Sequence, residues 1–438
     1  MQDFSAVSQA DQQRALWLST FAFTVCFAVW TIFSIIGIQI KQELGLNDTQ
    51  FGLLIATPIL TGSLSRLFLG IWSDQIGGRI VFTAVMLCAA AATWFLTTMS
   101  TYQGYLFAAL LVGIAGGSFA TGIAYVSKWF PTAKQGTALG IFGAGNIGAA
   151  VTKLGAPLIM VAYGWHTVAQ IWAVALAVTA VLFYLFTKDD PQLAARRTSG
   201  TKAVPFLKQL EPLKNLQVWR FSLYYFFVFG AFVALALWLP RYLVGAYGLD
   251  IATAGLIAAC YSIPASLFRV VGGWLSDKVG ARTVMYWTFG VSALCTFLLS
   301  YPTTTYVVTG VKGPIEFTLA MGLIPFTVLV FVLGFFMSLG KAAVFKHIPV
   351  YYPNNVGAVG GVVGMIGGLG GFILPITFGA LNDLIGIWTS SFMLLFVLVS
   401  IAFVWMHFAI RRMDAARNPQ ATRDTDLPEI MAAQEARK

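Results

Sequence analysis

The sequence predicts an all-α integral membrane protein, with twelve transmembrane helices arranged as two pseudo-symmetric six-helix bundles. Three observations support this fold class. Of the 438 residues, 58% are hydrophobic and only 10% are charged, whereas soluble domains carry about 25% charged residues. Apolar stretches long enough to span a ~30 Å hydrocarbon core recur along most of the chain. In addition, part of the second half repeats the first half without a gap.

The apolar stretches define twelve expected spans, each long enough for a membrane-crossing helix. The first span follows a polar leader that contains Arg14 and lacks a small-residue cleavage site, so we expect a retained helix and not a signal peptide. The expected spans are residues 17–40, 51–73, 79–99, 103–127, 137–161, 167–187, 219–244, 252–275, 283–301, 317–342, 356–380 and 387–410.

Polar segments divide the chain into five expected parts. The longest interior polar stretch separates six spans from six and predicts a cytoplasmic linker, while the charged C-terminal segment has the composition of a disordered tail. The parts are a cytoplasmic leader (1–16), an N-terminal bundle (17–187), the linker (188–218), a C-terminal bundle (219–410) and a cytoplasmic tail (411–438).

The basic residues predict the orientation in the membrane. Most of the 27 Lys and Arg residues fall on the same side as the N-terminus, and Lys41, Arg241 and Lys312 fall on the other. By the positive-inside rule, both termini of this multi-pass protein are expected in the cytoplasm. The net charge of +10 therefore requires no nucleic-acid partner.

An internal repeat relates the two halves at an offset of 203 residues. The stretch GLNDTQFGLLIATPILTGSLSRLFLGIWSDQIGGR aligns with GLDIATAGLIAACYSIPASLFRVVGGWLSDKVGAR, and 13 of 35 positions are identical. Within it, Arg66 matches Arg269. The segments WFPTAKQGTALGIFGAGNIG and YYPNNVGAVGGVVGMIGGLG form a second, weaker repeat. Spans 2 and 8 therefore correspond, as do spans 5 and 11.

Six-helix repeats with a Gly-Asp-Arg loop after the second helix of each half resemble the major facilitator superfamily over essentially the whole chain. The resemblance implies a substrate site near the midplane between two rocking halves. It also implies that Asp74 with Arg79, and Asp277 with Arg282, form cytoplasmic gating loops. Simple capping of helix ends is an equally good explanation of these four residues.

Two arginines inside spans point to an anionic substrate. The residues four positions from Arg66 are Gly62 and Gly70, and those from Arg269 are Ala265 and Gly273; such small residues permit close helix packing. We therefore expect both guanidinium groups to face each other inside the bundle. The alternative is that each long side chain snorkels to the interface. No Asp or Glu lies deep within a span, so a substrate anion would supply the missing counter-charge.

Further motifs restrict the size of the expected anion. Spans 5 and 11 are dense in glycine, which permits close helix packing and predicts a small cavity. These spans, the two arginines and AGGSFATGIAYVSKWFP in span 4 resemble the nitrate/nitrite porter family of the superfamily. The resemblance implies that Arg66 and Arg269 clamp nitrate, and possible site residues beside them are Asn146, Tyr225, Phe119 and Phe229. Tyr224, adjacent to Tyr225, is the alternative source of the hydroxyl. The resemblance thus implies a nitrate transporter of the bacterial inner membrane, with nitrite as a second substrate.

One residue could couple nitrate transport to proton transport. Lys153 lies two turns beyond Asn146 on the same helical face. Burial and nearby cations disfavour its charged form, so Lys153 is a candidate proton carrier for nitrate/proton symport. Snorkelling of Lys153 to the outer rim is the alternative. Lys341 and Lys346 are expected near the end of span 10, with Lys341 the deeper of the two. Nitrate/nitrite exchange needs no titrating residue and stays the second hypothesis for transport.

Other function classes fit the sequence less well. GAGNIG matches the dinucleotide fingerprint without a surrounding βαβ unit, and no P-loop motif occurs, so we expect no nucleotide, cofactor or metal. The three histidines, His166, His347 and His407, are scattered and form no nucleophile-base pattern, so we expect no enzyme. A carrier of another small monovalent anion, and an anion channel, stay as alternatives. The expected partners are nitrate or nitrite, protons and the lipid bilayer.

Overall fold

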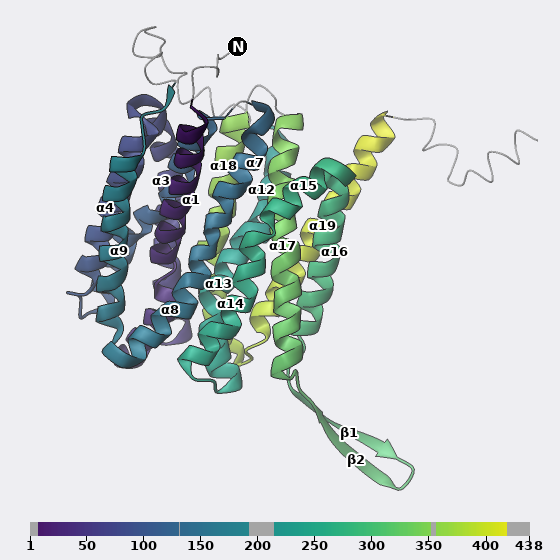
Figure 1. Cartoon of the computed structure of the whole chain (residues 1–438). Helices are drawn as coiled ribbons and strands as arrows, with labels where there is room; N and C mark the ends of the chain where they lie inside the picture. Colours follow the sequence, from purple (N-terminus) through teal and green to yellow (C-terminus); the bar gives the residue numbers. More distant parts are fainter. Residues whose placement is uncertain (1–7, 131, 192–213, 352–355, 418–438) are drawn as a thin grey trace, which may run out of the picture.

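The computed structural model describes residues 8–130, 132–191, 214–351 and 356–417. Its helices stand side by side in one elongated bundle, with a hairpin projecting from the end opposite the N-terminus (Figure 1). Eleven helices of the described residues are long and apolar enough to cross a membrane. A further helix, Asp48–Ile76, has 29 residues and spans about 44 Å at 1.5 Å per residue. The predicted all-α membrane fold is confirmed.

The first half of the chain forms one group of helices. Each predicted span corresponds to a single helix or to two helices joined by a short irregular turn. The elements are α1 (Gln9–Trp30), α2 (Phe33–Leu44), α3 (Asp48–Ile76), α4 (Gly78–Leu96), α5 (Tyr102–Val112), η1 (Gly113–Gly117), α6 (Ser118–Ser127), α7 (Thr132–Gly143), η2 (Ala144–Ile147), α8 (Gly148–Tyr163) and α9 (Trp165–Phe186).

The second half forms the corresponding group and adds a two-stranded sheet. The elements are α12 (Leu216–Tyr225), η4 (Phe226–Ala231), α13 (Phe232–Tyr247), α14 (Ile251–Leu267), α15 (Arg269–Val279), α16 (Ala281–Leu299), β1 (Thr304–Gly310), β2 (Gly313–Leu319), α17 (Leu323–Tyr351), α18 (Val356–Ile385) and α19 (Ser390–Arg417).

The sheet corrects the expected start of the tenth span. Residues 317–319 belong to β2, which pairs antiparallel with β1, and the helix α17 begins only at Leu323. The segment TTYVVTG is rich in β-branched and aromatic residues, which favour strands. Gly313 has φ 129°, a conformation that glycine adopts without a steric penalty. The apolar composition of β2 had made the strand look like the beginning of the helix.

Helix interruptions fall in the middle of the bundle, at the depth of the two arginines. The chain has 3₁₀ geometry at η1 and η2, which are glycine-containing, and π geometry at η4. The helix pair α14 and α15 is interrupted at Phe268, which has φ −72° and ψ 2°. In contrast, α3 runs without interruption through Arg66. Irregular backbone inside a membrane bundle is tolerated where protein covers it.

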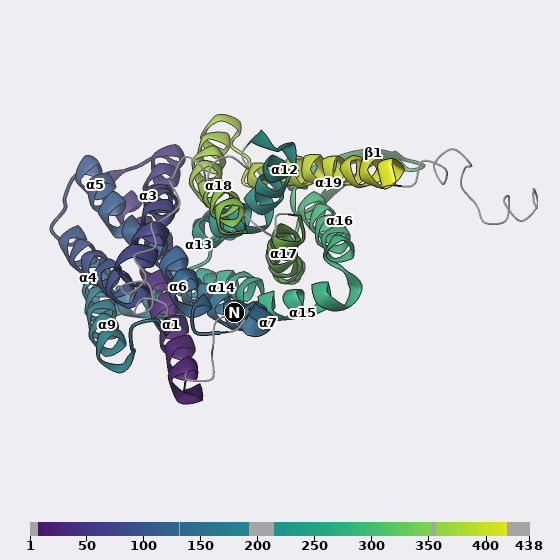
Figure 2. The ribbon, with the colours of Figure 1, turned by 90° about the horizontal axis from the view of Figure 1, so that it is seen from above.

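The two halves meet along glycine-lined helix contacts, with α3 against α18 and α8 against α14. A Cβ atom added at Gly52 would lie 2.4 Å from the Pro375 carbonyl oxygen, and one at Gly255 would lie 2.4 Å from that of Lys153. Seen from above, α14 lies beside helices of the first half and α7 lies beside α15 (Figure 2). Substitution at these glycines would push the halves apart.

A polar cluster joins the halves at the hairpin end. The Asp48 carboxylate, only 6% exposed, lies 3.2 Å from Lys41 Nζ and 3.1 Å from Arg241 Nη2, and it accepts a hydrogen bond from Asn382. Asp383 accepts hydrogen bonds from the backbone amides of Asp48 and Thr49. The buried carboxylate is paired and hydrogen-bonded, as burial of a charge requires. These contacts close the bundle at this end.

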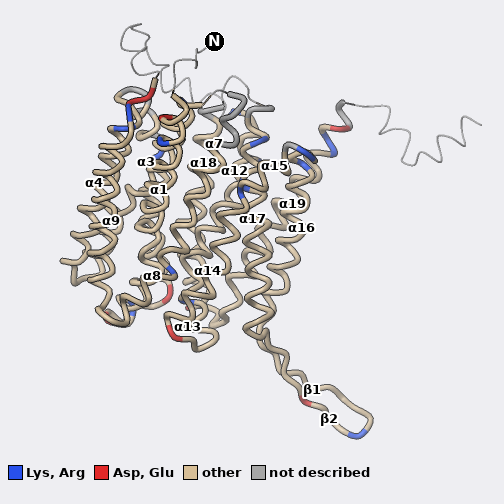
Figure 3. The backbone as a smooth tube through the Cα atoms, viewed as in Figure 1, with Lys and Arg blue, Asp and Glu red and all other residues tan. Residues whose placement is uncertain are grey.

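Basic residues gather toward the end that carries the N-terminus, and few lie at the hairpin end (Figure 3). The predicted orientation and the domain boundaries stay predictions. Much of the expected linker 188–218 lies outside the described residues, although α12 begins at Leu216 within it. Of the expected tail 411–438, the part up to Arg417 is helical, and the remainder is outside the described residues.

Candidate functional site

Arg66 lies inside the bundle, with only 7% of its surface exposed. Its Nε donates a hydrogen bond to the Gly116 carbonyl at 3.3 Å, and its Nη1 donates to the Gly364 carbonyl of the other half at 3.3 Å. The expected small residue at Gly62 lets Trp30 approach, because a Cβ there would lie 2.5 Å from the indole Nε1. The snorkelling alternative is therefore not what the structure shows for this side chain.

Arg269 lies at the corresponding place in the second half and is 8% exposed. It is the first residue of α15, directly after the interruption at Phe268. Its Nη1 atom is buried and has no hydrogen-bond partner in the described part of the chain. Neither Arg269 nor Arg66 forms an ion pair among the described residues. Both charges therefore lack a protein counter-ion there.

Aromatic rings fill the space around the two guanidinium groups. The ring of Phe119 lies near both groups, with its centroid 5.2 Å from Arg66 Cζ and 5.7 Å from Arg269 Cζ. The ring of Phe229 is 5.3 Å from Arg66 Cζ. At these distances the rings attract the cations by cation–π interaction. The two arginines that the repeat predicted thus lie near the same aromatic ring.

Two other predicted site residues, Tyr225 and Asn146, have buried polar atoms without partners among the described residues. Tyr225 is fully buried, stacks on Phe229 at 5.1 Å, and has a hydroxyl without a hydrogen-bond partner among the described residues. Asn146 in η2 is fully buried as well, and neither its amide oxygen nor its amide nitrogen has such a partner. Buried polar groups are almost always hydrogen-bonded in proteins. Unpaired donors next to uncompensated arginines are typical of a site for a polar ligand.

Tyr224, the alternative to Tyr225, points elsewhere. Its ring packs against Phe221 and Phe289, 6.2 and 5.5 Å away. Residues 224 and 225 are adjacent on a helix and so face different sides of it. The structure therefore brings Tyr225, and not Tyr224, to the aromatic rings that contact Arg66.

Glycines of the two predicted glycine-rich spans approach both arginines. A Cβ atom added at Gly143 would lie 3.3 Å from the Arg269 guanidinium, and one at Gly368 would lie 3.4 Å from Arg66 Nη1. Gly143 directly precedes η2, which carries Asn146. The absence of side chains at these two positions leaves room for the guanidinium groups, which agrees with a small site.

Two lysines are buried in the same bundle. Lys153 is fully buried, and its ammonium donates hydrogen bonds to the Ala149 carbonyl at 3.1 Å and to Ser262 Oγ of the other half at 3.0 Å. It does not snorkel. Lys341 on α17 is also fully buried, and its ammonium donates to the Ala265 carbonyl at 2.5 Å. Lys346, five residues further along, is exposed.

The predicted gate residues are only partly described. The side chains of Asp74 and Asp277 lie outside the described part of the structure. Arg79 donates to the Tyr184 carbonyl and pairs with Asp189 at 3.7 Å. Arg282 pairs with Asp414 at 3.2 Å and donates to the Tyr351 hydroxyl at 2.9 Å. Each of the two arginines thus contacts the last helix of its own half or the segment beside it.

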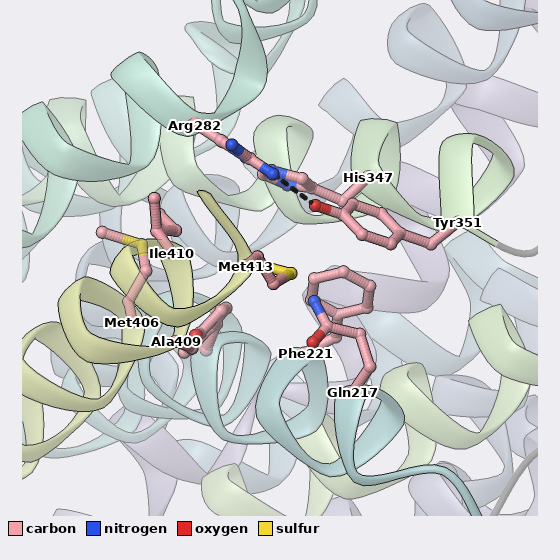
Figure 4. Close-up of a pocket in the computed structure, with 10 residues that line it drawn as sticks. Gln217, Phe221, Arg282, His347, Tyr351, Met406, Ala409, Ile410 and Met413 are labelled. Atoms are coloured by element: carbon pink, nitrogen blue, oxygen red, sulfur yellow. Dashed lines mark hydrogen bonds between the residues drawn. The ribbon is translucent and has the colours of Figure 1, made fainter. Parts of the chain in front are cut away.

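A surface pocket between α12, α16, α17 and α19 is separate from this site. Figure 4 shows Arg282 hydrogen-bonded to Tyr351, with His347 and Met413 beside them. Neither Arg66 nor Arg269 lines the pocket. Among the described residues, no group of three or more His, Cys, Asp or Glu side chains could hold a metal ion. The chemistry of the molecule therefore centres on the two arginines.

Sequence analysis missed several residues at the site. Trp30, whose indole donates to the Pro58 carbonyl at 2.8 Å, has its ring 5.4 Å from Arg66 Cζ. The Phe345 ring is 5.9 Å from Arg269 Cζ and 4.9 Å from the ring of Tyr225. In a chain with 15% aromatic residues, no local pattern distinguishes these rings from lipid-facing ones. Only the packing of α1 and α17 reveals them.

Comparison with known proteins identifies relatives of this chain. The Major Facilitator Superfamily profile matches residues 18–326 and 242–434. A Thermus thermophilus protein named as a probable nitrate/nitrite antiporter, NarK1, is 45% identical over 92% of this chain and 93% of its own length. The nitrite extrusion protein of Bacillus subtilis is 30% identical over 94% and 98%, and the probable nitrate/nitrite transporter NarK2 of Mycobacterium tuberculosis is 32% identical over 85% and 90%.

Solved structures share the fold. A bacterial homologue of the human lysosomal transporter Spinster, in an inward-facing and occupied conformation, matches with a TM-score of 0.68. The identity is 16%, and the match covers 96% of this chain and all of the other. The same transporter in an inward-facing and unoccupied conformation gives a TM-score of 0.69 over 92% of this chain and 98% of the other.

Proposed function

This chain belongs to the major facilitator superfamily and, within it, to the family of nitrate/nitrite porters, and we propose that it carries nitrate across the bacterial inner membrane by alternating access. It is a membrane transporter and not an enzyme, as the sequence predicted. Nitrite is the second substrate of the proposal. The curated relatives support both anions, since they are named for nitrate or nitrite.

The observation that carries the proposal is the set of unpaired charges and donors at the bundle centre. Arg269 Nη1, the Tyr225 hydroxyl and the Asn146 amide lack hydrogen-bond partners among the described residues. Arg66 and Arg269 both lie near the ring of Phe119. A planar anion with several acceptor oxygens satisfies guanidinium, hydroxyl and amide donors together. The flat rings of Phe119 and Phe229 suit a weakly hydrated ion such as nitrate.

The same charges couple binding to reorientation. Two cations ~8 Å apart repel by ~2 kcal/mol at an effective dielectric of ~20, whereas an anion ~4 Å from each gains ~4 kcal/mol twice before desolvation. The empty site therefore opposes closure of the halves and the loaded site accepts it. The closed cluster around Asp48 at the hairpin end supports an inward-facing arrangement, with both termini in the cytoplasm.

Lys153 gives the transporter a route to proton coupling. Its ammonium is fully buried and donates hydrogen bonds to two neutral groups, the Ala149 carbonyl and Ser262 Oγ. Because Ser262 belongs to the other half, protonation of Lys153 also acts on a contact between the halves. We therefore propose nitrate/proton symport, with Lys153 as the proton-carrying group.

Nitrate/nitrite exchange is the second candidate, because the 45% identical Thermus relative is named an antiporter. Uptake of nitrate into proteoliposomes containing the purified protein separates the two. We expect an imposed inward proton gradient to drive accumulation without internal nitrite, and Lys153→Gln to abolish that dependence on the gradient. Uptake that requires preloaded nitrite would establish exchange and return Lys153 to a structural role.

Competition assays in the same vesicles test the substrate. Formate and acetate at tenfold excess are expected to leave most nitrate uptake intact, because their substituents do not match a flat ion with three equivalent oxygens. Strong inhibition by either anion would instead support a carrier for another small monovalent anion. Uptake that does not saturate with nitrate concentration would indicate a channel.

A further inference from the structure

Lys341 is a fully buried cation that the proposed transport mechanism does not use. It lies near the middle of α17, and its ammonium donates a hydrogen bond to the Ala265 carbonyl at 2.5 Å. On another side, the ammonium lies 3.6 Å from the ring centroid of Phe232. A lysine buried in a membrane protein is costly and marks function by default.

The carbonyl that Lys341 contacts belongs to the last turn of α14, at the interruption before Arg269. In an uninterrupted helix, the Arg269 amide would donate to the Ala265 carbonyl four residues earlier. Here α14 ends at Leu267, and Arg269 starts a new helix. The final carbonyls of a helix need other donors. Lys341 supplies one of these donors, to the carbonyl four residues before Arg269.

The first half has no such helix interruption before its arginine. Its helix α3 passes through Arg66 without interruption, so the backbone needs no outside donor there. Lys341 lies as many residues before Pro353 as Phe119 lies before Pro131. The repeat therefore places a lysine in the second half where the first half has Phe119, whose ring is near both arginines. The two residues occupy related positions and have different contacts.

We propose that Lys341 is a positioning residue for anion binding, which holds the interruption between α14 and α15 and thereby aims Arg269 at the substrate. The inference rests on the proposed function, because it assigns the substrate contact to Arg269. The ammonium holds the end of α14 through its hydrogen bond to the Ala265 carbonyl. The Nη1 atom of Arg269, which has no partner among the described residues, stays available to the anion. Phe232 holds the ammonium in this position by its ring.

The test measures nitrate binding and uptake by the full-length protein. Nitrate binding is followed as the rise in melting temperature of purified protein with potassium nitrate, against potassium gluconate at equal ionic strength. Uptake into proteoliposomes gives KM and the maximal rate. We expect Lys341→Met to raise KM by about tenfold, the lower range for a lost charge-assisted hydrogen bond, with a maximal rate within twofold of the unchanged protein.

Two variants distinguish positioning from general packing. Lys341→Arg keeps the charge and the donors and is expected to restore KM to within about threefold, since it still reaches the carbonyl. Lys346→Met removes an exposed charge from the same helix and is expected to leave KM unchanged. In an Arg269→Lys background, Lys341→Met should add little, because residues that act through each other are not additive.

The outcomes separate the two proposals. If the unchanged protein shows neither nitrate stabilisation nor nitrate uptake, the proposed function is wrong. If it shows both and Lys341→Met keeps the same KM, or changes KM equally in the Arg269→Lys background, the positioning role is wrong. If Lys341→Met does not yield folded protein, Phe232→Leu is used in its place. It is expected to raise KM by about threefold through loss of a cation–π contact, and an unchanged KM would contradict the proposal.

Discussion

The two halves of the molecule carry the same arginine at the same place in a repeated segment, but they surround it differently. Arg66 belongs to an uninterrupted helix and donates hydrogen bonds to the carbonyls of Gly116 and Gly364. Arg269 follows a helix interruption, and its Nη1 atom has no partner among the described residues. Sequence symmetry therefore does not impose equal roles, because each guanidinium is held by residues outside the repeated segment.

We infer from this comparison that protein carbonyls hold Arg66 in place, whereas Arg269 keeps a donor for the ligand. Arg66 contacts Gly364 across the interface between the halves, so it also contributes to their association. Arg269 has its buried donor free for a ligand. Substitutions at matched positions in the two halves test this difference.

The largest effect is expected for lysine at either arginine. Arg269→Lys and Arg66→Lys each keep the charge but lose the planar fork, so nitrate affinity should fall by ~30-fold or more, equivalent to ~2 kcal/mol for a charge-assisted hydrogen bond. The two variants should differ from each other in melting temperature when nitrate is absent. Only Arg66→Lys should lower the melting temperature, because of the two arginines only Arg66 donates to carbonyls of the described residues. Normal uptake by either variant, at normal expression, would contradict the clamp.

A smaller effect is expected when a methyl group is added beside Arg269. In Gly143→Ala the new Cβ would lie 3.3 Å from the guanidinium, which forces a shift of a few tenths of an ångström. Nitrate KM should rise by about fivefold, since tight contacts of this kind cost ~1 kcal/mol. Gly140→Ala, one turn earlier with no atom within 4 Å of its Cβ, is the matched control. Equal KM values for both variants would argue that Arg269 does not contact the substrate.

The next effect concerns the hydroxyl of Tyr225. Tyr225→Phe removes a group without a hydrogen-bond partner among the described residues, so the melting temperature without nitrate should stay constant. The KM for nitrate should rise by about threefold to tenfold, the value of one hydrogen bond of ~1 kcal/mol. Tyr224→Phe, which contacts Phe221 and Phe289, should leave KM unchanged. The reverse pattern would place Tyr224 in the site.

The smallest effect is expected at the corresponding arginines near the N-terminal end of the bundle. Arg79 and Arg282 are partly exposed and pair with Asp189 and Asp414. Exposed ion pairs contribute about 0–1 kcal/mol, so Arg79→Gln and Arg282→Gln should change nitrate KM by less than about twofold. A large fall in the maximal rate with constant KM would indicate a gate, whereas a fall in melting temperature alone would indicate capping of helix ends.

Much of the architecture could be predicted because a bilayer makes strong local demands on a sequence. A membrane helix needs about 20 apolar residues, so composition alone located most spans. The repeat then paired Arg66 with Arg269. Apolar residues of a strand meet the same hydrophobicity criterion as the start of a membrane helix. For that reason the sequence places the end of β2 in the tenth span. The gate aspartates Asp74 and Asp277 stay untested, because their side chains are outside the described structure.

By itself, the sequence determined the membrane class, the two repeated halves, the glycine-rich helices and the two arginines inside spans, from which an anionic substrate is predicted. These follow from composition, spacing and charge along the chain. The tertiary structure decided which tyrosine joins the site, that Lys153 and Lys341 are buried, and which donors are left without partners. Those features depend on contacts between residues far apart in the chain, such as Lys341 with Ala265 and Arg66 with Gly364, and such contacts exist only once the helices pack.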